Sequence, residues 1–203
     1  MGEKNQKKSG DGIFGCIPHV RGAWSVNGKV RVMIRNAFLC IAGTICLVGC
    51  VFGPKVDNAP VGSLKLSRYL GVWYEIARFD HSFERGVESA KALYTQNAAG
   101  TIKVVNSGIK NGKEKTAVGK GKTTGTPGLL RVSFFGPFYA DYRVMKIDAD
   151  YRYALVGSGG ADYLWLLSRT KEMPENVKIE FLAEARRRGY DMTRLIWVKH
   201  EKK

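Results

Sequence analysis

From about residue 72 to residue 169, apolar and polar positions alternate in short runs that are separated by turn signals. Alternation of this kind places successive side chains on opposite faces of a β-strand. The runs that predict strands cover residues 72–80, 88–96, 101–110, 113–124, 128–135, 138–147, 151–158 and 162–169. Eight strands at this spacing with tight links predict an all-β fold, an up-and-down antiparallel barrel.

The links between these runs favour hairpins between consecutive strands. Asn111-Gly112 is the strongest signal, because both central positions of a two-residue type I′ turn require positive φ. Other links read TPG, GP and DAD, which are residue types that turns prefer. We therefore expect each strand to pair with its neighbour in the sequence.

The apolar spacing changes after the eighth run and predicts one C-terminal α-helix packed outside the barrel. Residues 174–188 begin with Pro174 and are followed by Gly189, which is typical of a helix with its two ends. The apolar residues on one face of this helix are Val177, Phe181, Leu182 and Ala185. Residues 194–200 then predict a short closing strand. A barrel of eight strands leaves an interior that can hold one small ligand.

An uninterrupted apolar run of 13 residues, from Ala37 to Gly49, ends directly at Cys50. The run is shorter than the roughly 20 residues that a membrane-spanning helix needs. Basic residues precede it, and a basic flank with a short apolar core is typical of a secretory signal. The letters Leu47-Val48-Gly49-Cys50 resemble the lipobox of bacterial lipoproteins, in which the signal is cut before a cysteine that becomes acylated. We therefore expect lipid attachment at Cys50, and an ordinary signal or an uncleaved short anchor is the alternative.

These features divide the chain into three parts. They are a leader with a lipoprotein signal over residues 1–49, a lipidated tether over 50–66 and a barrel domain over 67–203. Met33 is a second candidate for the true start, because the residues before it are polar and aperiodic and "MIRNAFLC" opens a compact signal. By analogy with Gram-negative sorting, Val51 rather than Asp after the cysteine predicts the outer membrane. We expect the lipid to anchor the protein in the outer membrane, on its periplasmic face.

The charge of the chain is strongly basic, with 33 Lys and Arg against 18 Asp and Glu and a net charge of +15. The leader holds seven basic and two acidic residues, so the chain from residue 50 onward keeps a net charge of +10. This charge suits anionic headgroups or lipopolysaccharide, but a solvated basic surface is the interpretation that we favour. No basic-aromatic nucleic-acid motif is present, so we expect no nucleic-acid partner.

Cysteine and histidine usage excludes several kinds of chemistry. The four cysteines, all in the first fifty residues, are Cys16, Cys40, Cys46 and Cys50. The barrel region therefore has no disulfide and no thiol nucleophile. His81 and His200 lack the spacing of metal ligands, so we expect no metal and no cofactor. His81 lies beside Asp80 with Glu84 nearby, but no nucleophile motif accompanies them, and we expect a binding protein and not an enzyme.

Three segments in order carry a resemblance to a known family. "LSRYLGVWYEIARFDHSFERG" (66–86) resembles the first signature of lipocalins, which contains Gly-x-Trp. "VSFFGPFY" (132–139) and "DYLWLLSRT" (162–170) are similar to segments of the bacterial, lipid-anchored and apolipoprotein D-like branch. The resemblance covers about residues 64–200 and implies a lipocalin barrel. The second signature departs from the family, since residues 150–154 are one position tighter, which leaves the turn before this strand open.

The resemblance implies a structural role for Gly71, Trp73 and Arg169. In the family the guanidinium packs over the indole at the closed end of the barrel. A cation over an indole face contributes about 0.5–2 kcal/mol. The pair joins the first and last barrel strands, so we expect these residues to maintain the fold and not to contact ligand.

Strand alternation extends the resemblance to a ligand site. If Arg169 points inward, then Leu167, Trp165 and Tyr163 share its face. The residues that we expect to line the interior are Leu130, Val132, Phe134, Trp165 and Leu167, with Tyr139 near the pocket. Arg85 is expected at the rim as a solvated loop charge, and contact with a phosphate or carboxylate headgroup is the alternative. The alternative to a ligand cavity is that these aromatic residues fill a tight core.

The expected function is that of a membrane-anchored lipocalin. Its partner is a lipid-like amphiphile, a fatty acid or lysophospholipid, and its role is lipid transport, storage or scavenging. A structural envelope lipoprotein with a filled barrel is the first alternative, and a lipocalin-like enzyme is the second. The oligomeric state is open, with a dimer among the options.

Overall fold

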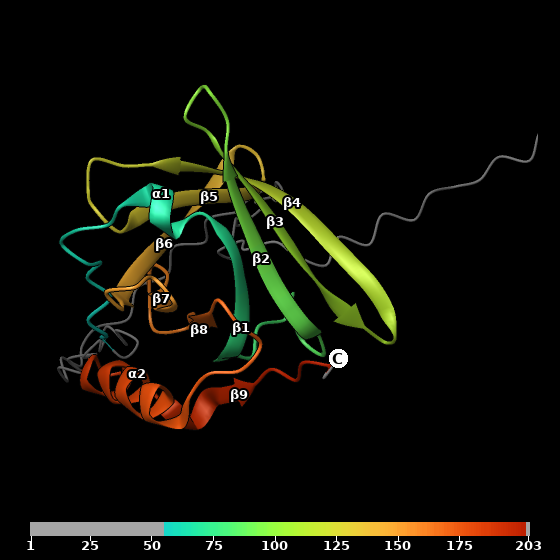
Figure 1. The fold of residues 1–203 in the computed structure, drawn as a ribbon, viewed down its shortest axis with the longest axis vertical. Coiled ribbons are helices and arrows are strands. Elements are labelled where there is room, and N and C mark those ends of the chain that lie inside the picture. The colour runs from blue at the N-terminus through green and yellow to red at the C-terminus, as the bar shows by residue number, and fades with distance from the viewer. Residues whose placement is uncertain (1–54, 202–203) are drawn as a thin grey trace, which may run out of the picture.

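The computed structural model describes residues 55–201, so the leader, Met33 and Cys50 lie outside the described residues. The strands are β1 (Gly71–Phe79), β2 (Glu88–Gln96), β3 (Ile102–Lys110), β4 (Lys113–Thr123), β5 (Leu129–Phe135), β6 (Phe138–Ile147), β7 (Tyr153–Gly157), β8 (Leu164–Ser168) and β9 (Leu195–Trp197). The helices are α1 (Leu66–Tyr69), α2 (Glu175–Arg187) and a single 3₁₀ turn, η1 (Met192–Arg194). Figure 1 shows these elements.

Consecutive strands pair antiparallel from β1 to β8, and β8 pairs back with β1, which closes the barrel. The first part of β1, Gly71–Tyr74, pairs with β2, and the part from Tyr74 to Arg78 pairs with β8. In its second half β9 pairs with Ala77–Phe79, so β9 takes the place of β2 beside that part of β1. Hairpins alternate between two ends, so the β1–β2, β3–β4, β5–β6 and β7–β8 links share one end, which we call the mouth.

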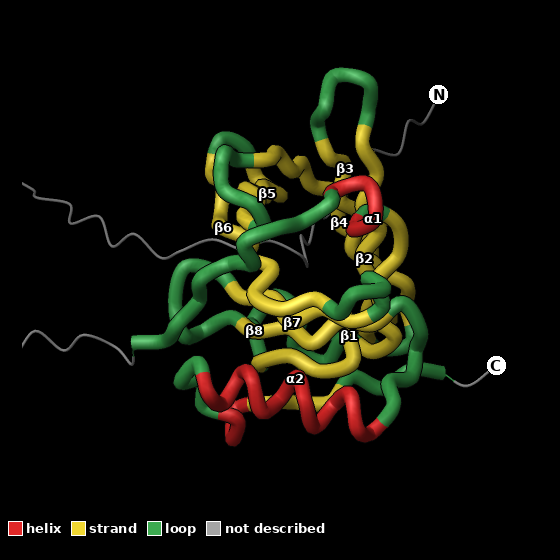
Figure 2. Tube along the Cα trace, turned by 60° about the vertical axis from the view of Figure 1, so that its left-hand side comes forward, coloured by secondary structure: helices red, strands yellow, loops and turns green. Residues whose placement is uncertain are grey.

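Alternation along the strands separates two hydrophobic clusters. Leu164 and Leu166 on β8 face outward and pack with Phe181 and Ala185 of α2. Leu167 and Trp165 face the barrel interior and belong to the second cluster. Helix α2 therefore lies against the outer face of the barrel beside β1, β7 and β8, as Figure 2 shows.

The closed end is fixed by Arg169. Its Cζ lies 3.8 Å from the centroid of the Trp73 ring, and the indole is completely buried. The guanidinium donates to the carbonyl oxygens of Val72, Arg68, Tyr69 and Tyr151 at distances of 2.7 to 3.1 Å. The φ of Gly71 is +97°, and a Cβ there would lie 3.3 Å from Arg169 Nη1. Glycine is therefore required both for this φ and for the close approach of the guanidinium.

Strand β1 contains an irregularity that changes which side chains face inward. Its register with β8 shifts between Glu75 and Ala77. In a regular strand, residues three apart face opposite sides, and a bulge reverses this relation. Glu75 and Arg78 consequently share the inner side, while Phe79 packs in the cluster with α2.

Three expected strands differ from the structure by more than one residue at an end. The strand expected over 151–158 is β7 at Tyr153–Gly157, because the Asp148 carboxylate accepts from the backbone of Arg152 and Tyr153 and holds a turn there. The strand expected over 162–169 is the shorter β8. The strand expected over 194–200 is only β9 at Leu195–Trp197, because Asp191 accepts from Thr193 N and begins η1 instead.

The segment expected to be a tether is packed on the barrel wherever the structure describes it. Asp57 N donates to Arg188 O at 2.8 Å, and Val61 N donates to Val144 O at 2.8 Å. The Arg188 guanidinium donates back to the carbonyls of Asp57 and Ala59. Residues 55–65 thus run along the outside of the barrel to α1 without regular secondary structure.

Candidate functional site

A cavity opens inside the barrel among β1, β2, β3, β5, β6 and β8. Its apolar wall includes Ala92, Val104, Val132, Phe134, Ala140, Trp165 and Leu167. The cavity contains about 680 Å³ of space between atoms, part of it open to solvent, but a water-sized sphere can be centred in only about 60 Å³. At about 10–15 Å³ per water centre, this is room for roughly four to six waters.

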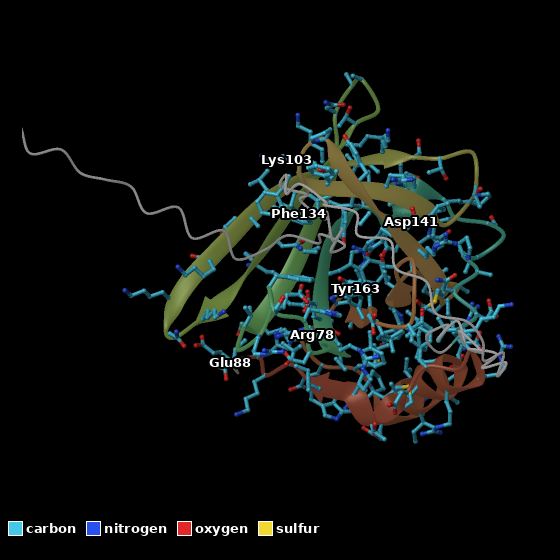
Figure 3. All side chains as sticks on the ribbon, turned by 180° about the vertical axis from the view of Figure 1, so that it is seen from behind. Arg78, Glu88, Lys103, Phe134, Asp141 and Tyr163 are labelled. Atoms are coloured by element: carbon cyan, nitrogen blue, oxygen red, sulfur yellow. The ribbon has the colours of Figure 1, made fainter. Side chains whose placement is uncertain are left out.

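The sequence-predicted residues fall into two groups. Val132, Phe134, Trp165 and Leu167 line the cavity together. Leu130 lies in the same interior cluster but does not line the cavity. Tyr139 lines a neighbouring recess with Tyr163, and Lys122 Nζ lies 4.6 Å from its ring centroid. Figure 3 marks Phe134, Asp141 and Arg78, which come from three strands around the interior.

The closed end of the interior is filled by three tyrosines. Tyr69 OH and Tyr142 OH lie 2.6 Å apart, and Tyr94 OH donates to Tyr142 OH at 3.1 Å. Burial raises the pKa values of Tyr69 and Tyr142 well above their ordinary value of 10.0, so both phenols stay neutral. These three hydrogen-bonded tyrosines therefore form the floor of the cavity at the closed end of the barrel.

A buried charged cluster, Glu75, Arg78 and Glu84, forms the wall near the β1–β2 loop. Arg78 Nη1 donates to Glu75 Oε2 at 3.2 Å, and Arg78 Nε lies 3.6 Å from Glu84 Oε2. Arg78 Nη2 also donates to the carbonyl oxygens of Glu84 and Val87. Trp165 Nε1 donates to Glu84 Oε2 at 3.2 Å, which connects the cluster to the apolar wall.

Both carboxyl groups of the cluster favour their protonated forms. Burial raises the pKa of Glu75. Burial, followed by the neighbouring Glu75, raises the pKa of Glu84 well above its ordinary value. Each carboxyl group lies next to the Arg78 guanidinium, which lowers its pKa and so partly offsets the effect of burial. Sequence reasoning missed Glu75 and Arg78, because alternation places residues three apart on opposite faces.

Aromatic rings pack around His81 at the mouth. Its ring stacks on those of Phe83 and Tyr163 at centroid distances of 5.2 and 4.7 Å, and Trp165 lies 5.0 Å away. Burial, followed by the charge of Arg78, lowers the pKa of His81 to about 4, so the imidazole is neutral at pH 7. The ring therefore serves as part of the aromatic rim.

The acidic neighbours of His81 in the sequence have partners elsewhere. Asp80 accepts from Arg85 Nε at 2.7 Å in an exposed ion pair, and Glu84 belongs to the buried cluster. The structure therefore does not assemble Asp80, His81 and Glu84 into one group. Arg85, which was expected at the rim, points to solvent with 67% of its side chain exposed.

Within residues 55–201 no three His, Cys, Asp or Glu side chains are grouped so that they could hold a metal ion. In the same part of the chain no helix is long and apolar enough to cross a membrane.

Residues 64–200 match a family model described as a lipocalin-like domain. The chain is 48% identical over 142 residues to outer membrane lipoprotein Blc of Escherichia coli (strain K12), an alignment that covers 68% of this chain and 80% of that protein. It is 41% identical over 173 residues to the protein of the same name from Vibrio cholerae, which covers 83% of this chain and 100% of that protein.

A solved structure supports the same architecture. Insecticyanin from the tobacco hornworm Manduca sexta aligns with a TM-score of 0.61 at 21% identity, covering 71% of this chain and 85% of that chain. At this identity the likeness concerns the fold alone. The predicted eight-stranded up-and-down barrel with a C-terminal helix and a closing strand is confirmed.

Proposed function

The chain belongs to the lipocalin family, and on this premise we propose that it is a membrane-anchored protein that binds a lipid-like amphiphile inside the barrel. The ligand is of the fatty acid or lysophospholipid class, and the role is lipid transport, storage or scavenging at the outer membrane. The observation that carries the proposal is the cavity itself, whose wall is mostly apolar and which also carries polar groups.

Burial of an acyl chain is the main source of affinity in this proposal. Apolar surface removed from water contributes about 25 cal/mol per Å². Such burial depends on area and not on direction, so the barrel accepts a range of chains. The cavity has room for only a few waters in this conformation, so entry of a chain requires wall side chains to move. Phe134 and Trp165, which are only partly buried, are the residues that we expect to move.

Membrane attachment is proposed at Cys50. The alignment with the Vibrio cholerae relative covers too much of this chain to begin at residue 64, so it extends into the segment that contains Cys50 and the apolar run. The relatives' shared name, outer membrane lipoprotein, supports an acylated cysteine and an outer-membrane location. The periplasmic face is part of the same proposal. No reaction is proposed, because Asp80, His81 and Glu84 have separate partners.

Native mass spectrometry of residues 51–203, purified without detergent, tests the proposal before and after lipid extraction. We expect a mass excess that equals a fatty acid or phospholipid fragment, that extraction removes and that added amphiphile restores. Ala140→Phe places a larger side chain in the cavity and should reduce the uptake, while Leu93→Phe on the outer face of β2 is the matched control.

A structural lipoprotein with a filled barrel is the second candidate, and the small free space favours it. A protein that carries no extra mass and does not respond to added amphiphiles would establish this alternative. Lipid binding would then be withdrawn.

A further inference from the structure

We propose that Glu75 and Glu84 form a polar subsite in the cavity that selects amphiphiles with a cationic amine head group over carboxylates of the same chain length. This inference rests on the proposed function, since it assumes that a ligand enters the barrel. It narrows the proposed ligand class, because it favours lysophospholipids whose head group carries an amine over fatty acids. A purely structural role for the two carboxyl groups is the outcome that the test must separate from it.

The charges of the cluster are unequal. It contains two carboxyl groups and one guanidinium, and both carboxyl groups line the cavity while Arg78 does not. Arg78 also divides its hydrogen bonds between these groups and two backbone carbonyls. No Lys or Arg is among the side chains that line this cavity. A ligand head group therefore meets carboxyl oxygens, with the compensating cation behind them.

The third carboxyl group of the cavity differs from these two. Asp141 accepts from Arg143 Nη2 at 2.7 Å and lies 3.4 Å from Arg131 Nε, so two guanidinium groups neutralise it. It is also partly exposed, with 23% of its side chain open to solvent. Glu75 and Glu84 share a single guanidinium and are almost completely buried. The unbalanced acidic charge of the cavity is thus confined to this pair.

An ammonium group fits this imbalance, because two buried carboxyl groups face the cavity with one guanidinium between them, and the ammonium can replace a proton held by the pair. Three donors on a primary ammonium can serve both carboxyl groups, and the displaced proton passes to the buffer. A carboxylate ligand would instead bring a further acidic group next to a buried pair that has only one guanidinium, which is unfavourable. The other titratable groups that face the pair are Tyr94 and Tyr142, which supply no cation, and His81, which is neutral at pH 7.

The position of the pair is consistent with a head group at the mouth. Glu84 lies in the β1–β2 loop, whereas the tyrosine floor lies at the closed end. The apolar wall between them includes Val104 and Leu167. A chain can therefore lie along the wall while its amine remains at the carboxyl pair.

The test uses the full chain with Cys50→Ser, which removes the acylation site, and three probes of equal length. Dodecylamine, dodecanol and dodecanoate are titrated below their micelle concentrations, with binding followed by tryptophan fluorescence and by calorimetry in two buffers of different ionisation enthalpy. We expect dodecylamine to bind at least tenfold more tightly than dodecanoate at pH 7. Close to one proton should be released for each amine bound.

Glu84→Gln keeps the shape of the side chain and removes its charge, so it should abolish both the preference and the proton release. Glu75→Gln is the second variant in case the first does not fold. Asp80→Asn is the matched control, since its carboxylate is exposed and paired with Arg85 outside the cavity.

The outcomes separate the two proposals. Binding of all three probes with equal affinity and no proton release would overturn the amine subsite and leave lipid binding intact. Tighter binding of dodecanoate would overturn it as well. Failure of every probe to bind would remove the proposed function together with the inference that rests on it.

Discussion

Arg169 at the closed end and Arg78 near the mouth are both bonded to backbone carbonyls, but they connect the chain differently. Arg169 donates to carbonyls that are up to 101 positions away in the sequence. Arg78 donates to carbonyls no more than nine positions away, in the loop that follows its own strand. The first arginine therefore ties distant parts of the barrel together, and the second holds one loop over the cavity.

The two arginines differ also in the charge of their partners. Arg169 rests on an indole face and on neutral carbonyls, and among residues 55–201 it has no ion pair within 4.0 Å. Arg78 faces two carboxyl groups that change charge with pH. The contribution of Arg169 to the free energy of unfolding is therefore expected to be independent of pH. The contribution of Arg78 is expected to change with pH, because its carboxyl partners gain or lose protons.

Trp73→Ala should have the largest effect, because it removes the ring on which Arg169 rests. Truncation of a buried aromatic lowers the free energy of unfolding by about 3–5 kcal/mol. Chemical denaturation measures this loss. Trp197→Ala on β9, where the side chain is about half exposed, is the control and should cost less than about 1 kcal/mol. An unchanged transition in Trp73→Ala would contradict the placement of this residue.

Arg78→Met should lower the free energy of unfolding by about 3 kcal/mol at pH 7 and by less at pH 4. The pKa of Glu84 is raised in the folded protein, so its stabilising effect is complete below the ordinary carboxyl pKa and is lost as pH rises through the folded pKa. Removal of the guanidinium raises the pKa of Glu84 further. The variant therefore loses more free energy of unfolding at pH 7 than at pH 4.

Arg169→Met sharpens the comparison as the companion variant. It removes hydrogen bonds from a charged donor, at a cost of about 2–3 kcal/mol that should be the same at pH 4 and pH 7. Urea denaturation at the two pH values measures both variants. Equal costs of Arg78→Met at pH 4 and pH 7 would show that the mouth is no more sensitive to pH than the closed end.

His81→Phe tests the rim with a smaller expected effect. The lowered pKa of His81 means that the unfolded chain takes up a proton near pH 6.5 while the folded protein does so only near pH 4. The native protein therefore loses stability as pH falls between these values, by about 3 kcal/mol at most. Phe retains the ring stacking, so the variant should lack this loss. Thermal melting at pH 7 and pH 4.5 compares the two proteins.

Arg85→Ala should have the smallest effect, below about 0.5 kcal/mol, because its ion pair with Asp80 is exposed. Denaturation with and without added salt measures it. A clear loss of affinity for an anionic amphiphile in this variant, with unchanged stability, would instead show that Arg85 contacts the head group of a ligand.

Much of the fold follows from local sequence patterns. The limits of β2 and β6 agree with the alternation, and the Asn111-Gly112 turn connects β3 to β4, because these features depend only on neighbouring residues. The Glu75–Arg78 contact could not be predicted in this way. It depends on a bulge in β1, which moves a charged residue to the inner face without any local sequence signal.

The candidate site could likewise be predicted only where local sequence patterns determine it. The inward row of β8 and β5 was predicted from alternation, and it lines the cavity through Val132, Phe134, Trp165 and Leu167. The position of Tyr139 depends on how the β5–β6 hairpin is placed relative to the β7–β8 loop, which is a long-range property. The packing of residues 55–65 likewise depends on backbone bonds to Val144 and Arg188.

The anchoring of Asp57 and Ala59 by Arg188 limits how far the barrel can stand from its membrane. Under the proposed acylation at Cys50, only five peptide steps separate the lipid from Lys55, the first described residue. Five residues span at most about 17 Å even when fully extended. The protein would therefore work within one barrel's width of a single leaflet, and exchange of ligand with a more distant membrane would require a separate carrier.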